Sequence, residues 1–361
     1  MQYLYDAYIG HDALQRAGWR DGLYHELTSG RLAGRAQGLP LTPLQGTALL
    51  ALCGVDRTAV LVVNGLHYLA LQIVFVLTLR WLTRRWDYTL LGFGLLLACK
   101  SPFAAVGGMF DFRLDFPALC WYGLVCCLVI RTGPFRSLGW SLAAGAAAGW
   151  LISGRFIAAA FVGAALAVMA ADNLVRAVFA HDGGVSRRHR LRELLCLSSC
   201  IATATIIAGP ILWAHRALIR GYYVVGHITG EEKHLRAATD GLNSWLDHLW
   251  YYPHSVLRVH LGPGVVLLLA MLGLVGLRRW RFRISAAGEH PEDDHDPLQV
   301  SQTKGRSELP VDLAAASRAM LACIVAPLTI LTLGTSKSGV VGGLLVAPLL
   351  LLSMLLLLRS M

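Results

Sequence analysis

Long apolar runs without charged residues constrain the fold of this chain more than any other feature. The run LLVAPLLLLSMLLLL, residues 344–358, has no ionisable side chain and none of the alternation that a membrane barrel requires. In hydrocarbon, a helix or a closed barrel alone satisfies every backbone group. The chain is 55% hydrophobic and 15% charged, with a mean hydropathy of +0.54. A soluble domain of 361 residues could not bury so much apolar surface. The sequence therefore predicts an all-α, polytopic transmembrane bundle.

About nine spans of roughly 20 residues can be placed along the chain. They lie near 57–79, 88–108, 116–131, 137–153, 156–178, 194–217, 263–277, 316–333 and 339–358. The span at 137–153 contains AAGAAAGW, and small residues at this spacing favour close packing between helices.

Basic residues gather in every second loop, which predicts the orientation of the spans. They are Arg80, Arg84, Arg85, Arg131, Arg136, Arg187, Arg188, Arg190, Arg192, Arg278, Arg279, Arg281, Arg283 and Arg359. The positive-inside rule places all of them in the cytoplasm. This bias explains the net charge of +10 without a nucleic-acid partner. A cytoplasmic loop is expected at 278–315, and its EHPEDDHD stretch is interpreted as a solvated loop.

The same orientation puts residues 1–56 and 218–262 outside the cytoplasm. Segment 1–56 predicts two interfacial helices around a turn, and the bundle itself covers 57–361. Because no apolar span or signal peptide precedes residue 57, we expect either a missing first transmembrane helix or a misassigned gene start. In 218–262, aromatic side chains indicate an interfacial belt, and the five histidines are expected at the surface.

The eight cysteines lie almost entirely within apolar runs and show no metal-ligand spacing with histidine. Cys196 and Cys200 share a helix face, which is more typical of packing than of chemistry. We therefore expect all eight thiols to be unpaired.

Ionisable residues on the predicted outer face are the candidate functional groups, because charges at bilayer depth are costly. They are Asp111, Arg113 and Asp115 in FDFRLD, Arg155 and Lys337 between spans, Lys100 inside the second span, and the acidic residues of segment 1–56. Lysine and arginine suit a phosphate, and a carboxylate can accept the proton of a hydroxyl or help to hold a metal. Structural alternatives stay open: Asp111 and Asp115 could pair with Arg113 in a loop, and the cations could extend to the interface from helix ends.

The order of these motifs resembles the GT-C superfamily of membrane glycosyltransferases, which includes protein O-mannosyltransferases and bacterial lipid A aminoarabinose transferases. YLYDAYIGHDALQRAGWRDGLYHEL is similar to the first outer loop of that family, and FDFRLDFPALCWYGL to its second acidic motif. AAGAAAGWLISGRFIAAAF and LGTSKSGVVGGLLVAPLLLL are similar to its Gly-rich span and its late Lys-containing turn. From the sequence we expect no counterpart to the family's first helix or to its large soluble outer domain.

The resemblance implies a helix bundle whose outer juxtamembrane helices cover an extracytoplasmic active site. The implied activity is sugar transfer from a polyprenyl-phosphate donor to a lipid, glycan or protein acceptor. It implies Asp6 as the nearest match to the family's catalytic acid.

From the residues and the resemblance together we expect Asp115 and Asp111 as further catalytic carboxylates, and Lys337, Arg155, Arg113 and Lys100 as ligands of the donor phosphate. The cofactor is left open, with a divalent metal ion as one candidate. Two alternatives compete: a transporter or flippase of a lipid-linked or polar solute, and an inactive truncated paralogue. A transporter should carry charges midway along several spans, inverted repeats and broken helices. The sequence gathers its charges at one face, which favours the enzyme.

Overall fold

The computed structural model describes residues 2–28, 41–104, 106–179, 187–229, 241–242, 244–288, 312–334 and 337–360. Every regular element within these ranges is a helix, so the predicted all-α class is confirmed. The loop expected at 278–315 lies largely outside the described residues, although its first part continues a helix to Gly288.

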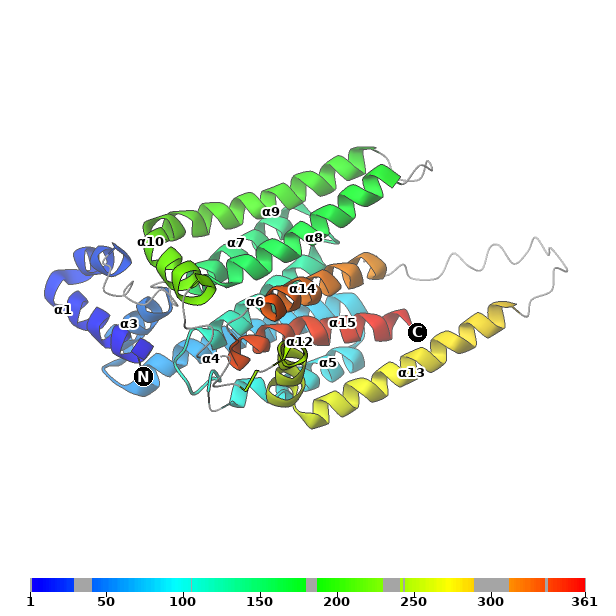
Figure 1. Ribbon diagram of the computed structural model, residues 1–361, viewed down its shortest axis with the longest axis horizontal. Coiled ribbons are helices and arrows are strands. Elements are labelled where there is room, and N and C mark those ends of the chain that lie inside the picture. Colours follow the sequence, from blue (N-terminus) through cyan, green and yellow to red (C-terminus); the bar gives the residue numbers. More distant parts are fainter. Residues whose placement is uncertain are drawn as a thin grey trace.

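A bundle of roughly parallel and antiparallel helices forms the body of the protein (Figure 1). Its members are α4 (Arg57–Thr83), α5 (Trp86–Ala98), α6 (Asp115–Arg131), α7 (Leu138–Gly154), α8 (Ala158–Phe179), α9 (Arg187–Ala214), α13 (Pro263–Gly288), α14 (Leu313–Leu333) and α15 (Val346–Arg359). The centre of the bundle is α6, in which every residue from Phe116 to Ile130 except Trp121 is buried. The exception is important, because Trp121 packs against the core and also lines a pocket.

A helix stands at each of the nine predicted spans, and among the described residues five helices are long and apolar enough to cross a membrane. They are Arg57–Thr83, Ala158–Arg176, Arg190–Ala214, Leu313–Leu333 and Gly339–Arg359. A sixth candidate is the pair Trp245–Leu261 and Pro263–Val275, which is bent by 105°. The remaining helices α5, α6 and α7 are 13, 17 and 17 residues long.

The helix α5 is shorter than predicted, which changes the position of Lys100. The predicted span 88–108 ends as a helix at Ala98, and Lys100 lies beyond it, exposed, before the short turn η1 (Ser101–Phe103). Pro102 lies in that turn and has no backbone N–H for a continuing helix. The expectation that Lys100 lies inside a span is therefore wrong.

The basic loops share one end of the bundle, as the alternation predicted. At this end Arg136, between α6 and α7, forms a 2.9 Å ion pair with Glu193 near the start of α9. The end of α8, the start of α14 and the C-terminus lie at the same end, on the right of Figure 1. The opposite end carries α1 (Gln2–Thr28) and α3 (Leu41–Cys53).

The two helices that the sequence predicts in segment 1–56 are present as α1 and α3, and α1 is 27 residues long. A kink divides α1 at Gly18, whose φ of 76° is readily adopted only by glycine. Its first part packs on α3, where the Thr47 hydroxyl donates to the carbonyl oxygen of Ala7 at 3.1 Å. The turn expected between the helices falls on residues 29–40, outside the described residues.

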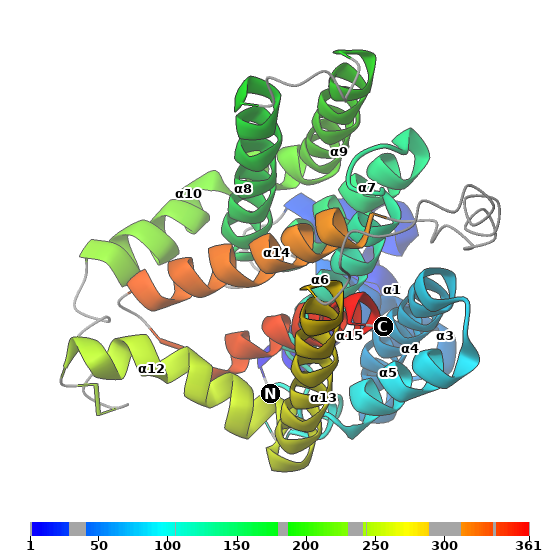
Figure 2. The same cartoon turned by 90° about the vertical axis from the view of Figure 1, so that its right-hand side faces the viewer.

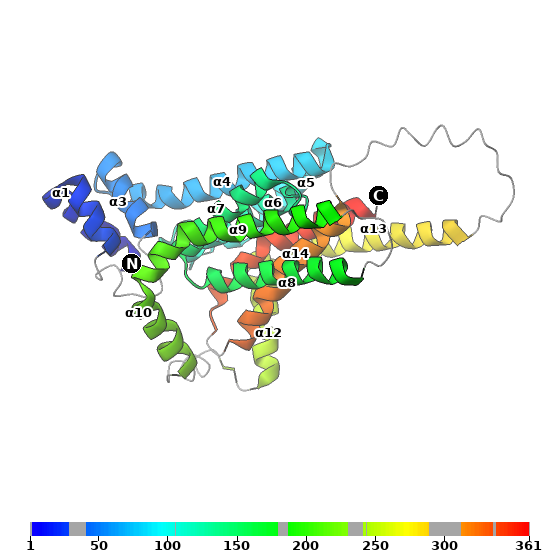
Figure 3. The same ribbon diagram turned by 90° about the horizontal axis from the view of Figure 1, so that it is seen from above.

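Two helical segments lie across the bundle rather than along it (Figures 2 and 3). One is α10 (Arg216–Ile219) with the π-helix η2 (Arg220–Thr229), and the other is α12 (Trp245–Ser255), which continues into η3 (Val256–Leu261). The described parts of segment 218–262 thus have the predicted helical and aromatic character. Trp245 and Trp250 are exposed on α12, as expected for an interfacial belt.

The expectation that the histidines of this segment are at the surface is wrong for His260. Its ring is 3% exposed, with Nδ1 at 3.0 Å from the Ser101 hydroxyl and Nε2 at 2.7 Å from the carbonyl oxygen of Gly339. A histidine in an apolar stretch can be buried where such partners satisfy both ring nitrogens. His227 and His234 lie outside the side chains that the structure describes.

The AAGAAAGW stretch packs α7 against α9, as the sequence predicted. A Cβ placed on Gly145 would collide with the backbone carbonyl of Cys200, and one on Gly149 would lie 2.8 Å from Cβ of Ile207. Both glycines therefore allow a close approach of the two backbones. All eight cysteines are free, as expected.

We predict that Gly145→Ala lowers the stability of the bundle by about 1–3 kcal/mol, the usual cost of overpacking a fitted interface. Gly139→Ala is the matched control, because Gly139 lies on the same helix with open space where its Cβ would be. Thermal unfolding of both variants in detergent measures the difference. Equal melting midpoints for the two variants would contradict the close α7–α9 contact.

Candidate functional site

An ion pair between Asp115 and Arg155 joins two helix ends at the α1–α3 end of the bundle. The Nη2 atom of Arg155 lies 2.8 Å from Oδ1 of Asp115, and the side chains are 13% and 14% exposed. Asp115 is the first residue of α6, and Arg155 follows the last residue of α7. Each charge therefore stands at the helix end whose dipole favours it. Arg155 lies between α7 and α8, the helices that stand at two of the predicted spans.

Three tyrosines surround this ion pair from α1 and η2. They are Tyr3, Tyr222 and Tyr223, and the ring of Tyr223 packs 5.0 Å from that of Phe156. Burial raises the pKa of Tyr223 to about 12, and burial likewise raises the pKa of Tyr3. Burial by itself would lower the pKa of Arg155, but Asp115 and the tyrosines outweigh it, so the pKa lies above its ordinary value. The guanidinium is therefore a permanent charge.

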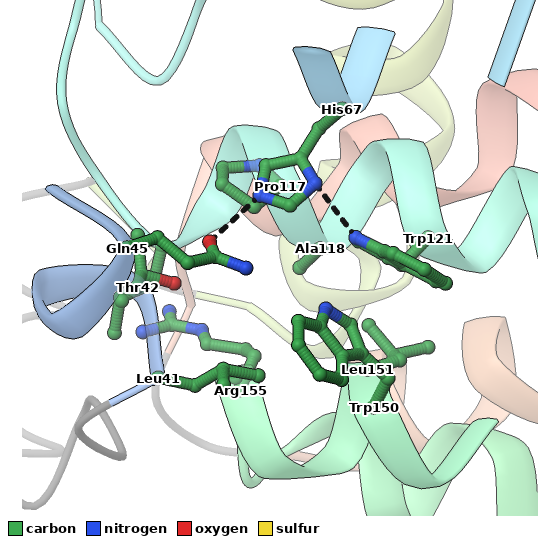
Figure 4. A pocket seen from close by; sticks show the side chains of 12 residues that line it. Leu41, Thr42, Gln45, His67, Pro117, Ala118, Trp121, Trp150, Leu151 and Arg155 are labelled. Carbon is green, nitrogen blue, oxygen red and sulfur yellow. Dashed lines mark hydrogen bonds between the residues drawn. The ribbon is translucent and has the colours of Figure 1, made fainter. Parts of the chain in front are cut away.

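A pocket opens beside Arg155 between α3, α4, α6 and α7 (Figure 4). Trp121 and Trp150 form one side, with ring centroids 5.7 Å apart, and Thr42 and Gln45 of α3 form the other. Arg155 extends toward α3 across the base of the pocket. The cavity proper is about 10 Å³, the space of roughly one water molecule. A larger ligand can enter only if α3 moves away from α7.

A chain of hydrogen bonds orients the polar groups of this pocket. The indole N–H of Trp121 donates to Nδ1 of His67 at 2.8 Å, so Nδ1 is the acceptor. The proton of a neutral ring is then on Nε2, which donates to Oε1 of Gln45 at 2.9 Å. The amide nitrogen of Gln45 is left facing the pocket, where it can donate to a ligand (Figure 4).

Asp111 and Arg113 form a separate ion pair within the loop before α6. Oδ2 of Asp111 lies 2.7 Å from Nε of Arg113 and accepts the backbone N–H of Gly107 at 2.8 Å. Asn64 of α4 is fully buried and donates to the carbonyl oxygens of Met109 and Asp111, at 3.0 and 3.2 Å. These contacts fix the loop conformation, as the loop-pair alternative of the sequence analysis anticipated for Asp111, whereas Asp115 turns to Arg155 instead.

Asp6 lies on the same end of the bundle as the Asp115–Arg155 pair. It is 6% exposed and stands one turn along α1 from Tyr3, which neighbours Arg155. The next residue, Ala7, packs in one apolar cluster with Phe112 of the loop before α6. The first turns of α1 therefore bring Asp6 toward the acidic motif.

Lys337 lies away from this pocket and does not line it. Its ammonium donates to the carbonyl oxygens of Leu331 and Thr332 at 2.8 and 2.7 Å and lies 5.3 Å from the centre of the Tyr252 ring. These carbonyls end α14, so the charge complements the helix C-terminus. Burial lowers the pKa of Lys337 to about 8. The cations that the sequence grouped together thus divide between Arg155 at the pocket and Lys337 at the end of α14, with Lys100 exposed beyond α5.

The described residues contain no group of three or more histidine, cysteine, aspartate or glutamate side chains arranged to hold a metal ion.

Sequence reasoning missed several residues of the pocket. His67 carried a usable signal, because an ionisable residue inside a span marks a functional candidate by default. Trp121 and Trp150 lie within the quoted motifs, but nothing in the sequence indicates which side of each helix faces a pocket. The positions of Gln45 in the pocket and of Tyr3 near Arg155 depend on how α1 and α3 fold back over the bundle end, and no sequence pattern predicts that contact.

Comparison with known proteins gives no relative: no family model matches the chain, and no curated protein or solved structure matches it.

We predict that Asp115→Asn and Arg155→Gln each destabilise the protein by about 3 kcal/mol, because each leaves a largely buried partner unpaired. The double variant should recover part of the loss, since the two changes remove one interaction. Thermal unfolding in detergent gives all three values. Asp87→Asn, which disrupts the exposed Arg85–Asp87 pair, is the control and should have little effect. Strictly additive losses in the double variant would contradict the pairing.

Proposed function

We propose that this protein is a membrane glycosyltransferase that moves a sugar from a polyprenyl-phosphate donor to an acceptor hydroxyl outside the cytoplasm. The observation that carries the proposal is the pocket beside the Asp115–Arg155 pair. Its lining combines a permanent cation, two indole rings and an amide donor at one end of an apolar bundle, and the carboxylate of Asp115 pairs with that cation. A sugar offers an apolar face to the indoles and hydroxyls to the amide, and its phosphate suits the guanidinium.

The apolar surface of the bundle supports a position within a membrane. On α4, the side chains of Val62, Leu66, Leu69, Ile73 and Leu77 recur along one face and are each about half exposed. Contiguous apolar faces of this kind are rare on soluble monomers but suit lipid. With the basic loops in the cytoplasm, the pocket opens on the extracytoplasmic side, and about nine helices cross or enter the bilayer.

The chemistry follows from the two charges of the pair. Arg155 carries several N–H donors, so it can hold a phosphate while it keeps one bond to Asp115. The oxygen of the acceptor hydroxyl attacks the anomeric carbon, and the bond from that carbon to the phosphate oxygen breaks. The bonding pair leaves with the polyprenyl phosphate, and the hydroxyl proton passes to the carboxylate of Asp115, or to that of Asp6 on α1. Because charge grows on the leaving phosphate, a fixed guanidinium stabilises the transition state more than the ground state.

In this proposal, other predicted site residues hold the structure around the site in place. Asp111 and Arg113 hold the loop that places Asp115 at the start of α6. Lys337 holds the end of α14, and its lowered pKa makes it a weaker ligand for phosphate than Arg155.

A transporter or flippase is the second candidate, and one observation favours it. The 105° bend between α12–η3 and α13 resembles the broken helices that transporters use at their binding sites. The described charges still gather at the ends of the helices rather than midway along them, which favours the enzyme.

We predict that purified protein in proteoliposomes transfers labelled sugar from at least one member of a panel of polyprenyl-phosphate sugars. Asp115→Asn should reduce the rate by about 10²–10⁴-fold, the usual worth of a general base. Asp87→Asn is the matched control and should keep the wild-type rate. Folded protein that moves the intact donor across the bilayer without cleaving it would replace this proposal by the transporter. No reaction and no donor binding would favour the inactive paralogue.

We predict opposite sidedness for the two ends of the bundle. In a background without the eight cysteines, single cysteines at Arg192 and Gly241, both exposed, should react with an impermeant reagent from opposite sides of the membrane. Labelling of both positions from the same side would overturn the topology.

A further inference from the structure

A second cavity lies at the opposite end of the bundle, between α8 and α14. Its volume is about 250 Å³, far larger than the pocket beside Arg155. Its polar groups are Asp172, Asn173 and Arg176 near the end of α8, and Arg318 near the start of α14. These helix ends lie on the side of the basic loops (Figure 1), so the cavity is separate from the proposed catalytic site.

Within the described ranges of the chain, the cavity is lined by two arginines and one aspartate. Asp172 lies 2.7 Å from Nη2 of Arg176 and 3.4 Å from Nε of Arg318, so one carboxylate is shared between two guanidinium groups. The contact with Arg318 is too long for a good hydrogen bond. Both arginines are about 40% exposed, at 41% and 42%. Among the described residues, these two guanidinium groups therefore share a single carboxylate, at a place where an anion can reach them.

The rest of the lining is apolar and faces outward from the bundle. Val168 of α8 and Leu321 and Val325 of α14 are each about half exposed. These side chains extend the cavity toward the middle of the two helices, away from the charged end. The cavity is therefore amphipathic along the helix direction, with cations at its basic-loop end and an apolar wall beyond them.

The loop between α6 and α7 supplies an unusual inner wall. Phe135 lines the cavity, is fully buried and has a φ of 62°, a conformation that costs free energy for any residue other than glycine. The hydroxyl of Thr132 accepts the backbone N–H of Phe135 at 2.6 Å and holds this conformation. Such conformations persist where the surroundings enforce them, and they are enriched at ligand sites.

We propose that this cavity binds an anionic phospholipid of the cytoplasmic leaflet. Arg318, with Arg176, holds the lipid phosphate, and an acyl chain lies along Val168, Leu321 and Val325. Basic cavities between transmembrane helices on the cytoplasmic side suit such headgroups. The inference rests on the proposed membrane location and orientation but not on glycosyl transfer.

Thermal unfolding of the full-length protein in a neutral maltoside detergent tests the site, with phosphatidylglycerol or phosphatidylcholine added. Phosphatidylglycerol should raise the melting temperature of the protein more than phosphatidylcholine does. The melting temperature should rise with the concentration of phosphatidylglycerol and then reach a plateau. Arg318→Gln should weaken the apparent affinity about tenfold, the usual worth of one charge-assisted hydrogen bond. Val325→Trp should weaken it by filling the apolar part without changing the charge. Arg192→Gln, an exposed arginine at the same end, is the matched control.

Equal stabilisation by phosphatidylcholine would show that charge is not recognised, and would overturn the proposal. If inorganic phosphate alone stabilised the protein as much as phosphatidylglycerol does, the acyl chain would not contribute to binding, and the proposal of a lipid ligand would be wrong. An unchanged affinity in Arg318→Gln, or an equal loss in Arg192→Gln, would place any lipid effect elsewhere. Each of these outcomes leaves the glycosyltransferase proposal untouched, because the transfer assay depends on Asp115 at the other end of the bundle.

Discussion

The Asp115–Arg155 ion pair is the interaction on which the candidate site depends. It ties the first residue of the most buried helix, α6, to the end of α7, and the tyrosines of α1 and η2 gather around it. Two charges so little exposed are stable because each stands at the favourable end of a helix dipole and each is the other's partner. This pair and the loop before it explain why an apolar chain carries three ionisable residues between Asp111 and Asp115. Asp111 and Arg113 shape the loop, and Asp115 closes on a cation from another helix.

Among the described residues, the ion pairs of the bundle lie at its two ends. At one end, the Gln45–His67–Trp121 chain and Arg155 line a small pocket. At the other, Asp172 is shared by two arginines beside a larger cavity. Between them, α6 and α15 contribute mostly buried apolar side chains. An apolar middle with polar ends is what a bilayer demands of a helical bundle, since unpaired polar groups are costly in hydrocarbon.

The sequence predicted the helices well, because apolar runs and loop charges are local properties. Each expected span contains a helix, and the GAAAG stretch packs as its small residues indicate. The partners of the charges were not predictable, since they depend on the packing of distant segments. Asp115 pairs with Arg155, forty residues away, rather than with its neighbour Arg113. His260 is buried because Ser101 and Gly339 satisfy its ring, and Lys100 lies past a helix that ends early.

The most direct test of the central claim is an experimental structure of the protein bound to a non-hydrolysable polyprenyl-phosphonate sugar. We expect the phosphonate oxygens at hydrogen-bond distance from Arg155, the sugar against Trp150, and α3 displaced to admit it. A phosphonate bound at Lys337, or between α8 and α14, with the Arg155 pocket closed as it is here, would contradict the account.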